Sequence, residues 1–158
     1  MGRVPITKSG FSKLQKELET LKTVLLPENI KDIETARGHG DLSENAEYSA
    51  AKERQAYLYG KIKELENNLA LSDVIEITFI VTDKVIFGVS VCIEDMNNGE
   101  ATTYQLVGPL ESDINKNKIS VTAPLGKALM GKKIGDVINV KAPGGLKKYE
   151  IVDIFVEK

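Results

Sequence analysis

Apolar residues recur at helical spacing through the first half of the chain. Steps of three and four residues separate the members of a first run, Phe11, Leu14, Leu18, Leu21 and Leu25. This spacing predicts an amphipathic helix with a heptad seam. Thr7 fits an N-cap, with Ile6 before it at the position of a hydrophobic staple. Pro27 interrupts the seam, so it should kink the helix or start a second one.

A second apolar run follows a glycine-rich reversal. Ile30 and Ile33 first resume an apolar face that is out of phase with the first run, and Gly38-His39-Gly40 then ends the helix and permits a turn. Steps of three and four residues connect the positions beyond it, Tyr48, Ala51, Gln55, Leu58, Ile62, Leu65, Leu69 and Ser72. Two seams joined by a short loop predict an antiparallel coiled-coil hairpin, assigned to residues 1–75. The second seam is small or polar near the turn, so we expect a narrow tip and a firmly packed base.

The second half of the chain changes to runs rich in β-forming residues. Residues 84–93 and 102–107 are such runs, and Asn97-Asn98-Gly99 between them is a hairpin signal. Further strands fit residues 119–122, 136–140 and 149–155, with one short helix at about residues 125–130. Strands with a single helix predict a compact α+β domain, assigned to residues 76–158.

Composition narrows the function classes. The formal charge of −2 provides no basic field for bulk nucleic-acid binding, so such a contact would be local or made through a partner. The single cysteine excludes a disulfide framework, and the single histidine, His39, excludes a His-rich zinc site. No run approaches a membrane span, and the N-terminus lacks the apolar core of a signal peptide. We therefore expect a soluble cytoplasmic protein.

Two carboxylates, Asp41 and Glu44, lie three residues apart directly after the glycine turn. Spacing alone favours a structural interpretation, in which Asp41 is the N-cap of the second helix and Glu44 completes a capping box near the positive end of the helix dipole. A functional interpretation is compatible with it, because a carboxylate that caps one amide keeps lone pairs for other ligands.

The predicted rod favours a functional role for this pair. About 30 residues per arm at ~1.5 Å per residue give a rod roughly 45 Å long that ends in acid. Mg²⁺ is usually held by one or two carboxylates together with waters and substrate phosphates. Two carboxylates on a protruding tip are too few ligands to bind Mg²⁺ tightly by themselves. They are suited to completing a metal site in which another macromolecule supplies the remaining ligands.

The segment around the turn is the most distinctive in the chain. It reads Ala36-Arg-Gly-His-Gly-Asp-Leu-Ser-Glu-Asn-Ala-Glu-Tyr48 and continues through residues 50–54. It closely resembles the signature of the bacterial Gre transcript cleavage factors, more the GreA type than the GreB type. The match returns in Val107-Gly108, in residues 119–132, and in residues 142–145 and 149–151, so it covers essentially the whole chain in register. Mild departures are Ser43, where a basic residue is frequent, and Ala123, where a serine usually precedes the proline.

The resemblance implies a role in transcription elongation. Such factors bind bacterial RNA polymerase through a C-terminal domain with an FKBP-like fold, and their coiled coil enters the secondary channel of a backtracked polymerase. The tip carboxylates, here Asp41 and Glu44, help to hold the second Mg²⁺ and to position the attacking water, so that the polymerase hydrolyses its own transcript. The protein would then be a catalytic cofactor rather than an enzyme, and the Mg²⁺ would belong to the polymerase active site and not be held tightly by this chain alone.

Basic residues near the tip contact the extruded 3′ segment of the nascent RNA in this family. The matching residues are Arg37, Lys52 and Arg54. Each of them fits a solvated surface charge equally well, and Glu47 fits either an auxiliary role or a solvated charge. Tyr48 fits packing in the seam better than a platform for stacked bases. His39 fits the loop better than a proton shuttle.

Three other functions fit parts of the sequence. A homologue that occupies the channel without stimulating cleavage would share the rod, but the intact Asp41 and Glu44 pair argues against it. A prolyl isomerase would share the C-terminal fold, but fold alone is weak evidence of activity, and most aromatic residues of that half occupy predicted core positions. A plain coiled-coil adaptor would explain the rod but not the match at the tip. Pairing of the two helices within one chain favours a monomer.

Overall fold

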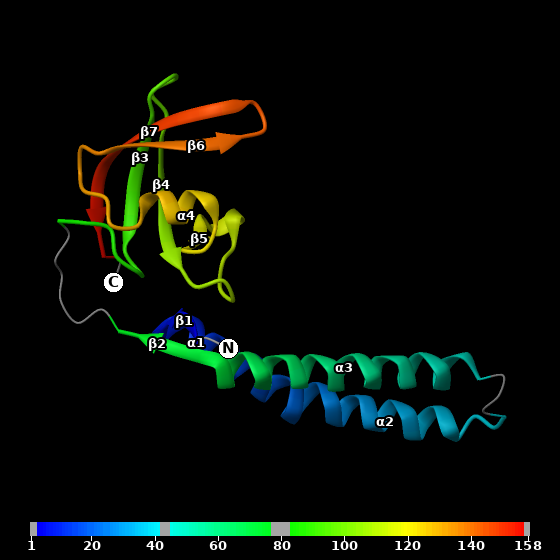
Figure 1. Ribbon diagram of the computed structural model, residues 1–158. Helices are drawn as coiled ribbons and strands as arrows, with labels where there is room; N and C mark the ends of the chain where they lie inside the picture. Colours follow the sequence, from blue (N-terminus) through cyan, green and yellow to red (C-terminus); the bar gives the residue numbers. More distant parts are fainter. Residues whose placement is uncertain (1–2, 42–44, 77–82, 157–158) are drawn as a thin grey trace. The chain divides into compact units, whose positions relative to one another are not determined.

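The structure, a computed structural model, describes residues 3–41, 45–76 and 83–156. Its contacts divide the chain into two compact units (Figure 1). One unit is Phe11–Leu71, and the other groups the residues up to Gly10 with those from Ser72 onward. The first unit is a helical hairpin and the second a mixed α+β sheet domain, so the predicted fold class is confirmed. The division into domains at residue 75 stays a prediction.

The hairpin consists of helical segments that pair in antiparallel fashion. In chain order they are α1 (Lys8–Thr20), the π-helical turn η1 (Leu21–Leu25), α2 (Leu26–Arg37) and α3 (Ala46–Leu71). Figure 1 shows α2 and α3 running side by side. Thr7 caps α1, as predicted, because its hydroxyl oxygen accepts a hydrogen bond from the Gly10 N–H at 3.1 Å.

The π-helical turn explains why the two apolar runs of the first arm are out of phase. The Leu26 N–H donates to the carbonyl oxygen of Leu21, five residues earlier, and Pro27 follows in the first turn of α2. The extra residue in the turn rotates the following helix face by about 100°. The predicted change of helix at Pro27 is thus confirmed. Ile30 is 41% exposed, however, and Asn29 takes the buried place beside it.

The hydrophobic core of the hairpin lies toward its base. Its buried members are Leu21, Leu58, Ile62 and Leu65, with the partly buried Leu14, Leu18, Leu25 and Leu26 packed against them. Nearer the turn, the seam positions Ala51 and Gln55 are only half-buried. The firmly packed base is therefore confirmed, and the narrow tip stays a prediction.

The sheet domain contains a five-stranded sheet in the order β5-β4-β3-β7-β6. Its elements are β3 (Ser90–Asp95), β4 (Ala101–Val107), η2 (Ile114–Lys116), β5 (Lys118–Ser120), α4 (Pro124–Leu129), β6 (Val137–Ala142) and β7 (Gly145–Phe155). Neighbouring strands are antiparallel except β4 and β5. The predicted hairpin turn is confirmed at Gly99, which has a φ of +75° between β3 and β4. The strand predicted from residue 84 begins only at Ser90, because Gly88 turns the chain there with a φ of +90°.

Two short strands flank the hairpin and belong to the sheet-domain unit. They are β1 (Val4–Thr7) and β2 (Ser72–Ile75), and they pair in parallel from Val4 opposite Ser72. Ser72, predicted as the last seam position, is therefore in a strand, because the helix ends at Leu71. No helix in the described part of the chain is both long and apolar enough to cross a membrane.

Candidate functional site

The turn at the end of α2 is built from backbone hydrogen bonds and one glycine with a positive φ. The Gly38 N–H donates to the carbonyl oxygen of Thr35 at 3.1 Å, and the His39 N–H donates to that of Ala36 at 3.1 Å. Gly40 has a φ of +111°, a conformation that other residues rarely adopt. The reversal predicted for the Gly-His-Gly sequence is confirmed. Asp41 follows this turn directly, and its side chain is exposed.

Asn45, rather than Asp41, is the N-cap of α3. Its Oδ1 accepts a hydrogen bond from the Tyr48 N–H at 3.0 Å, and its carbonyl oxygen accepts the first helical bond, from the Ser49 N–H, at 3.1 Å. These two bonds define an N-cap. The interpretation of Asp41 as the cap is therefore wrong. Asparagine is as good a cap as aspartate, but the Asp-x-x-Glu spacing of a capping box pointed to the earlier position.

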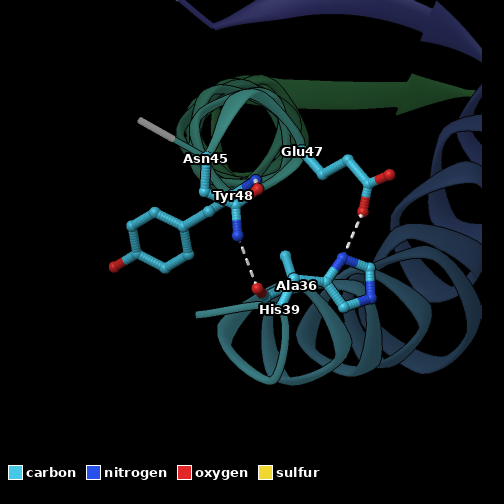
Figure 2. Close-up of polar contacts among 5 residues, drawn as sticks. All are labelled: Ala36, His39, Asn45, Glu47 and Tyr48. Atoms are coloured by element: carbon cyan, nitrogen blue, oxygen red, sulfur yellow. Dashed lines mark hydrogen bonds and ion pairs between the residues drawn. The ribbon is translucent and has the colours of Figure 1, made fainter. Parts of the chain in front are cut away.

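Asn45 also joins the two arms of the hairpin. Its Nδ2 donates to the carbonyl oxygen of Ala36 at 2.6 Å, and Figure 2 shows this bond spanning from the start of α3 to the end of α2. A second contact joins the same ends, because His39 Nδ1 lies 3.0 Å from Glu47 Oε2. Both of those side chains are more than half exposed, so this contact contributes little. The Tyr48 ring, expected in the seam, is half-buried and directed away from Ala36 and His39 (Figure 2).

Of the two carboxylates predicted to hold a metal ion, the structure describes only Asp41. Asp41 is exposed at the end of the turn, whereas Glu44 lies outside the described residues. In the part of the chain that is described, no three His, Cys, Asp or Glu side chains form a group that could hold a metal ion. The pairing of Asp41 with Glu44 in a shared metal site therefore stays a prediction.

The three predicted RNA-binding residues are exposed but do not share one face. Arg37 lies in the last turn of α2, and Lys52 and Arg54 lie on α3. Residues two apart on a helix point in different directions, so Lys52 and Arg54 face different sides. Arg54 lines a groove of about 380 Å³ between α2 and α3, together with the carboxylates of Asp32 and Glu47. Lys52 donates instead to Gln55 Oε1 at 3.0 Å.

The double role of Asn45 predicts a graded loss of stability. Asn45→Ala removes both the cap and the bond to Ala36, and we expect the free energy of unfolding of the hairpin to fall by about 1–2 kcal/mol. Asn45→Asp keeps an oxygen for the cap but loses the Nδ2 donor, so it should lower the free energy of unfolding by less. Urea unfolding followed by helical ellipticity measures both. Asn67→Ala, an exposed change on the same helix, is the control. Equal stability of Asn45→Asp and wild type would show that the bond to Ala36 contributes nothing.

Comparisons with known proteins match both halves of the chain. A family described as transcription elongation factor, N-terminal, matches residues 4–74, and one described as transcription elongation factor, GreA/GreB, C-term, matches residues 80–155. The transcription elongation factor GreA of Syntrophus aciditrophicus is 62% identical over 99% of this chain and 97% of its own length. That of Rhodospirillum rubrum is 51% identical over 96% of each chain. The solved structure of the GreA factor homolog 1 protein of Thermus thermophilus is 30% identical, with a TM-score of 0.44, over 96% of this chain and 98% of the other.

Proposed function

The chain belongs to the GreA/GreB family of transcription elongation factors, and we propose that it stimulates transcript cleavage by a backtracked bacterial RNA polymerase. In this proposal the domain of residues 76–158 binds the polymerase, and the hairpin of residues 1–75 enters the secondary channel. The observation that carries the proposal is the exposed side chain of Asp41, which follows the end of α2 in a paired helical hairpin. The protein acts in the cytoplasm, as a monomer, and is a catalytic cofactor rather than an enzyme.

Asp41 and Glu44 are the proposed ligands of a Mg²⁺ site shared with the polymerase. Carboxylate oxygens are the donors that Mg²⁺ prefers, and two of them leave most of the coordination sphere to the partner. A bound ion in a site of this kind supplies activation of water and stabilisation of the leaving oxygen. The contribution of this chain is to hold the carboxylates in place. The bond of Asn45 to Ala36 supports this role, because it joins the end of α2 to the start of α3.

Arg37 and Lys52 are the proposed contacts to the 3′ segment of the nascent RNA. Both are exposed near the turn, and an RNA phosphate gains from a nearby positive charge. Arg54 is assigned a smaller share of this contact. It lines the same groove as Asp32 and Glu47, and two carboxylates there would repel a phosphate.

The experiment that tests the proposal adds the purified protein to backtracked elongation complexes whose RNA is labelled at its 3′ end. We expect short labelled 3′ fragments to accumulate faster than in complexes without the protein. Complexes that are not backtracked are the control and should release none. Unchanged RNA would contradict the proposal. Unchanged RNA together with inhibited elongation would indicate an antagonist that occupies the channel without stimulating cleavage.

A further inference from the structure

In the half of the hairpin nearest the tip, α2 buries a polar side chain among its apolar ones. The buried apolar cluster of the hairpin is formed by Leu21, Leu58, Ile62 and Leu65, away from the turn. Toward the turn, the buried residues of α2 are Asn29, Ile33 and Ala36. Apolar burial is not directional, so it specifies the alignment of two helices less sharply than a hydrogen bond does. A directional contact within the seam would add to the bond from Asn45 to Ala36, which joins the two helix ends at the tip.

Asn29 makes such a contact from inside the seam. Its side chain is 2% exposed and lies four residues before Ile33, so it occupies a seam position of α2. Its Nδ2 donates to the carbonyl oxygen of Ala51 on α3 at 3.0 Å. This bond joins residues 22 apart in the sequence and crosses between the arms. The neighbouring Ile30 is 41% exposed, so a polar side chain takes the place that an aliphatic one could fill.

The other end of the Asn29 amide is left without a partner. Its Oδ1 is buried, and it accepts no hydrogen bond from any described residue. A buried acceptor without a donor lowers stability, and an apolar side chain of similar shape would avoid that loss. In coiled coils, one buried asparagine in a seam specifies the register at a cost in stability. Asn29 has both properties, because its Nδ2 makes a directional bond across the seam and its Oδ1 is a buried acceptor without a donor.

We propose that Asn29 is a positioning residue that fixes the register of α2 against α3 and thereby places the acidic turn. The inference rests on the proposed function only in taking that turn as the working end. A slip of one residue displaces one helix along the other by about 1.5 Å, and a misplacement of about 1 Å can reduce a reaction rate by roughly 100-fold. The bond from Asn45 to Ala36 depends on the same alignment, because it joins the two helix ends.

The proposal predicts that Asn29→Leu changes stability and activity in opposite directions. The midpoint temperature of hairpin unfolding should rise by about 4 °C, because the unpartnered acceptor is removed. The maximal rate of transcript cleavage at saturating protein should fall by about tenfold or more, while the half-saturating concentration stays unchanged. If Asn29 had only a structural role, its replacement would lower stability and activity together. Asn67→Leu makes the same change at an exposed position of α3 and should alter neither quantity.

Register itself is measured by the distance between spin labels at Glu34→Cys and Ser49→Cys, two exposed positions on α2 and α3, in a Cys92→Ala background. The parent should give one narrow distance distribution. Asn29→Leu, and Asn29→Ala as a variant with no added volume, should give a broadened or two-peaked one.

The results separate the proposal from the function on which it rests. An unchanged narrow distribution in both Asn29 variants would overturn it, as would a broadened distribution with full cleavage. If the wild-type protein stimulates no cleavage, the proposed function fails, but the distance distributions still decide whether Asn29 sets the register.

Discussion

Replacing Asp41 with asparagine is expected to reduce stimulation of transcript cleavage by roughly 100-fold or more while leaving binding to the polymerase nearly unchanged. The amide has the shape of the carboxylate but no charge, so it is a poor ligand for Mg²⁺. Glu44→Gln should have the same effect. The N-cap of α3 is Asn45, so neither change removes that cap. Cleavage of backtracked complexes measures the first quantity, and competition with wild-type protein for the polymerase measures the second.

Glu53→Gln is the matched control for this pair. Glu53 is an exposed carboxylate on α3, beyond the turn, so its neutralisation makes the same change in net charge. We expect it to retain full stimulation. Full activity of Asp41→Asn or of Glu44→Gln would contradict the assignment of that residue as a metal ligand. Equal losses in all three variants would show that overall charge, rather than the two tip carboxylates, supports cleavage.

Leu58→Ala is expected to lower the free energy of unfolding of the hairpin by about 2–5 kcal/mol. Leu58 is fully buried at 0% exposure in a cluster with Leu21, Ile62 and Leu65, so its truncation leaves a cavity in the hairpin core. Urea unfolding followed by helical ellipticity should show an earlier transition for the helices. Stimulation of cleavage should fall with it, because an unfolded hairpin cannot present the tip.

Tyr57→Ala provides the control for the core substitution. Tyr57 precedes Leu58 on α3 but is 60% exposed, so its truncation should change stability by no more than about 0.5 kcal/mol. A loss for Leu58→Ala no larger than that for Tyr57→Ala would mean that the cluster does not hold the hairpin together.

The sequence predicted those features that depend on local spacing. The heptad steps identified Leu58, Ile62 and Leu65 as buried, because apolar residues three and four apart share one face of a helix. The glycine turn and the β-hairpin at Gly99 were predictable for a similar reason, since few residues adopt a positive φ.

Features that depend on distant partners could not be predicted. The parallel pairing of β1 and β2 joins Val4 to Ser72, and neither four-residue segment has a period of its own. The π-helical turn rotates α2 so that Asn29 faces the seam and Ile30 faces out. From hydrophobicity alone, Ile30 would be expected to be buried and Asn29 exposed. At the candidate site, Asp and Asn are equally good caps, so the sequence alone could not assign the cap to Asn45. The partnership of Asp41 with Glu44 stays a prediction from sequence.

The Mg²⁺ dependence of cleavage tests the shared metal site most directly. Backtracked complexes are titrated with Mg²⁺ in the absence of the factor, with wild-type protein, and with Asp41→Asn. If the tip supplies ligands to the ion, the wild-type protein should lower the Mg²⁺ concentration that gives half-maximal cleavage, and Asp41→Asn should not. A half-maximal concentration that is the same in all three titrations, with only the plateau raised by the wild-type protein, would contradict the account.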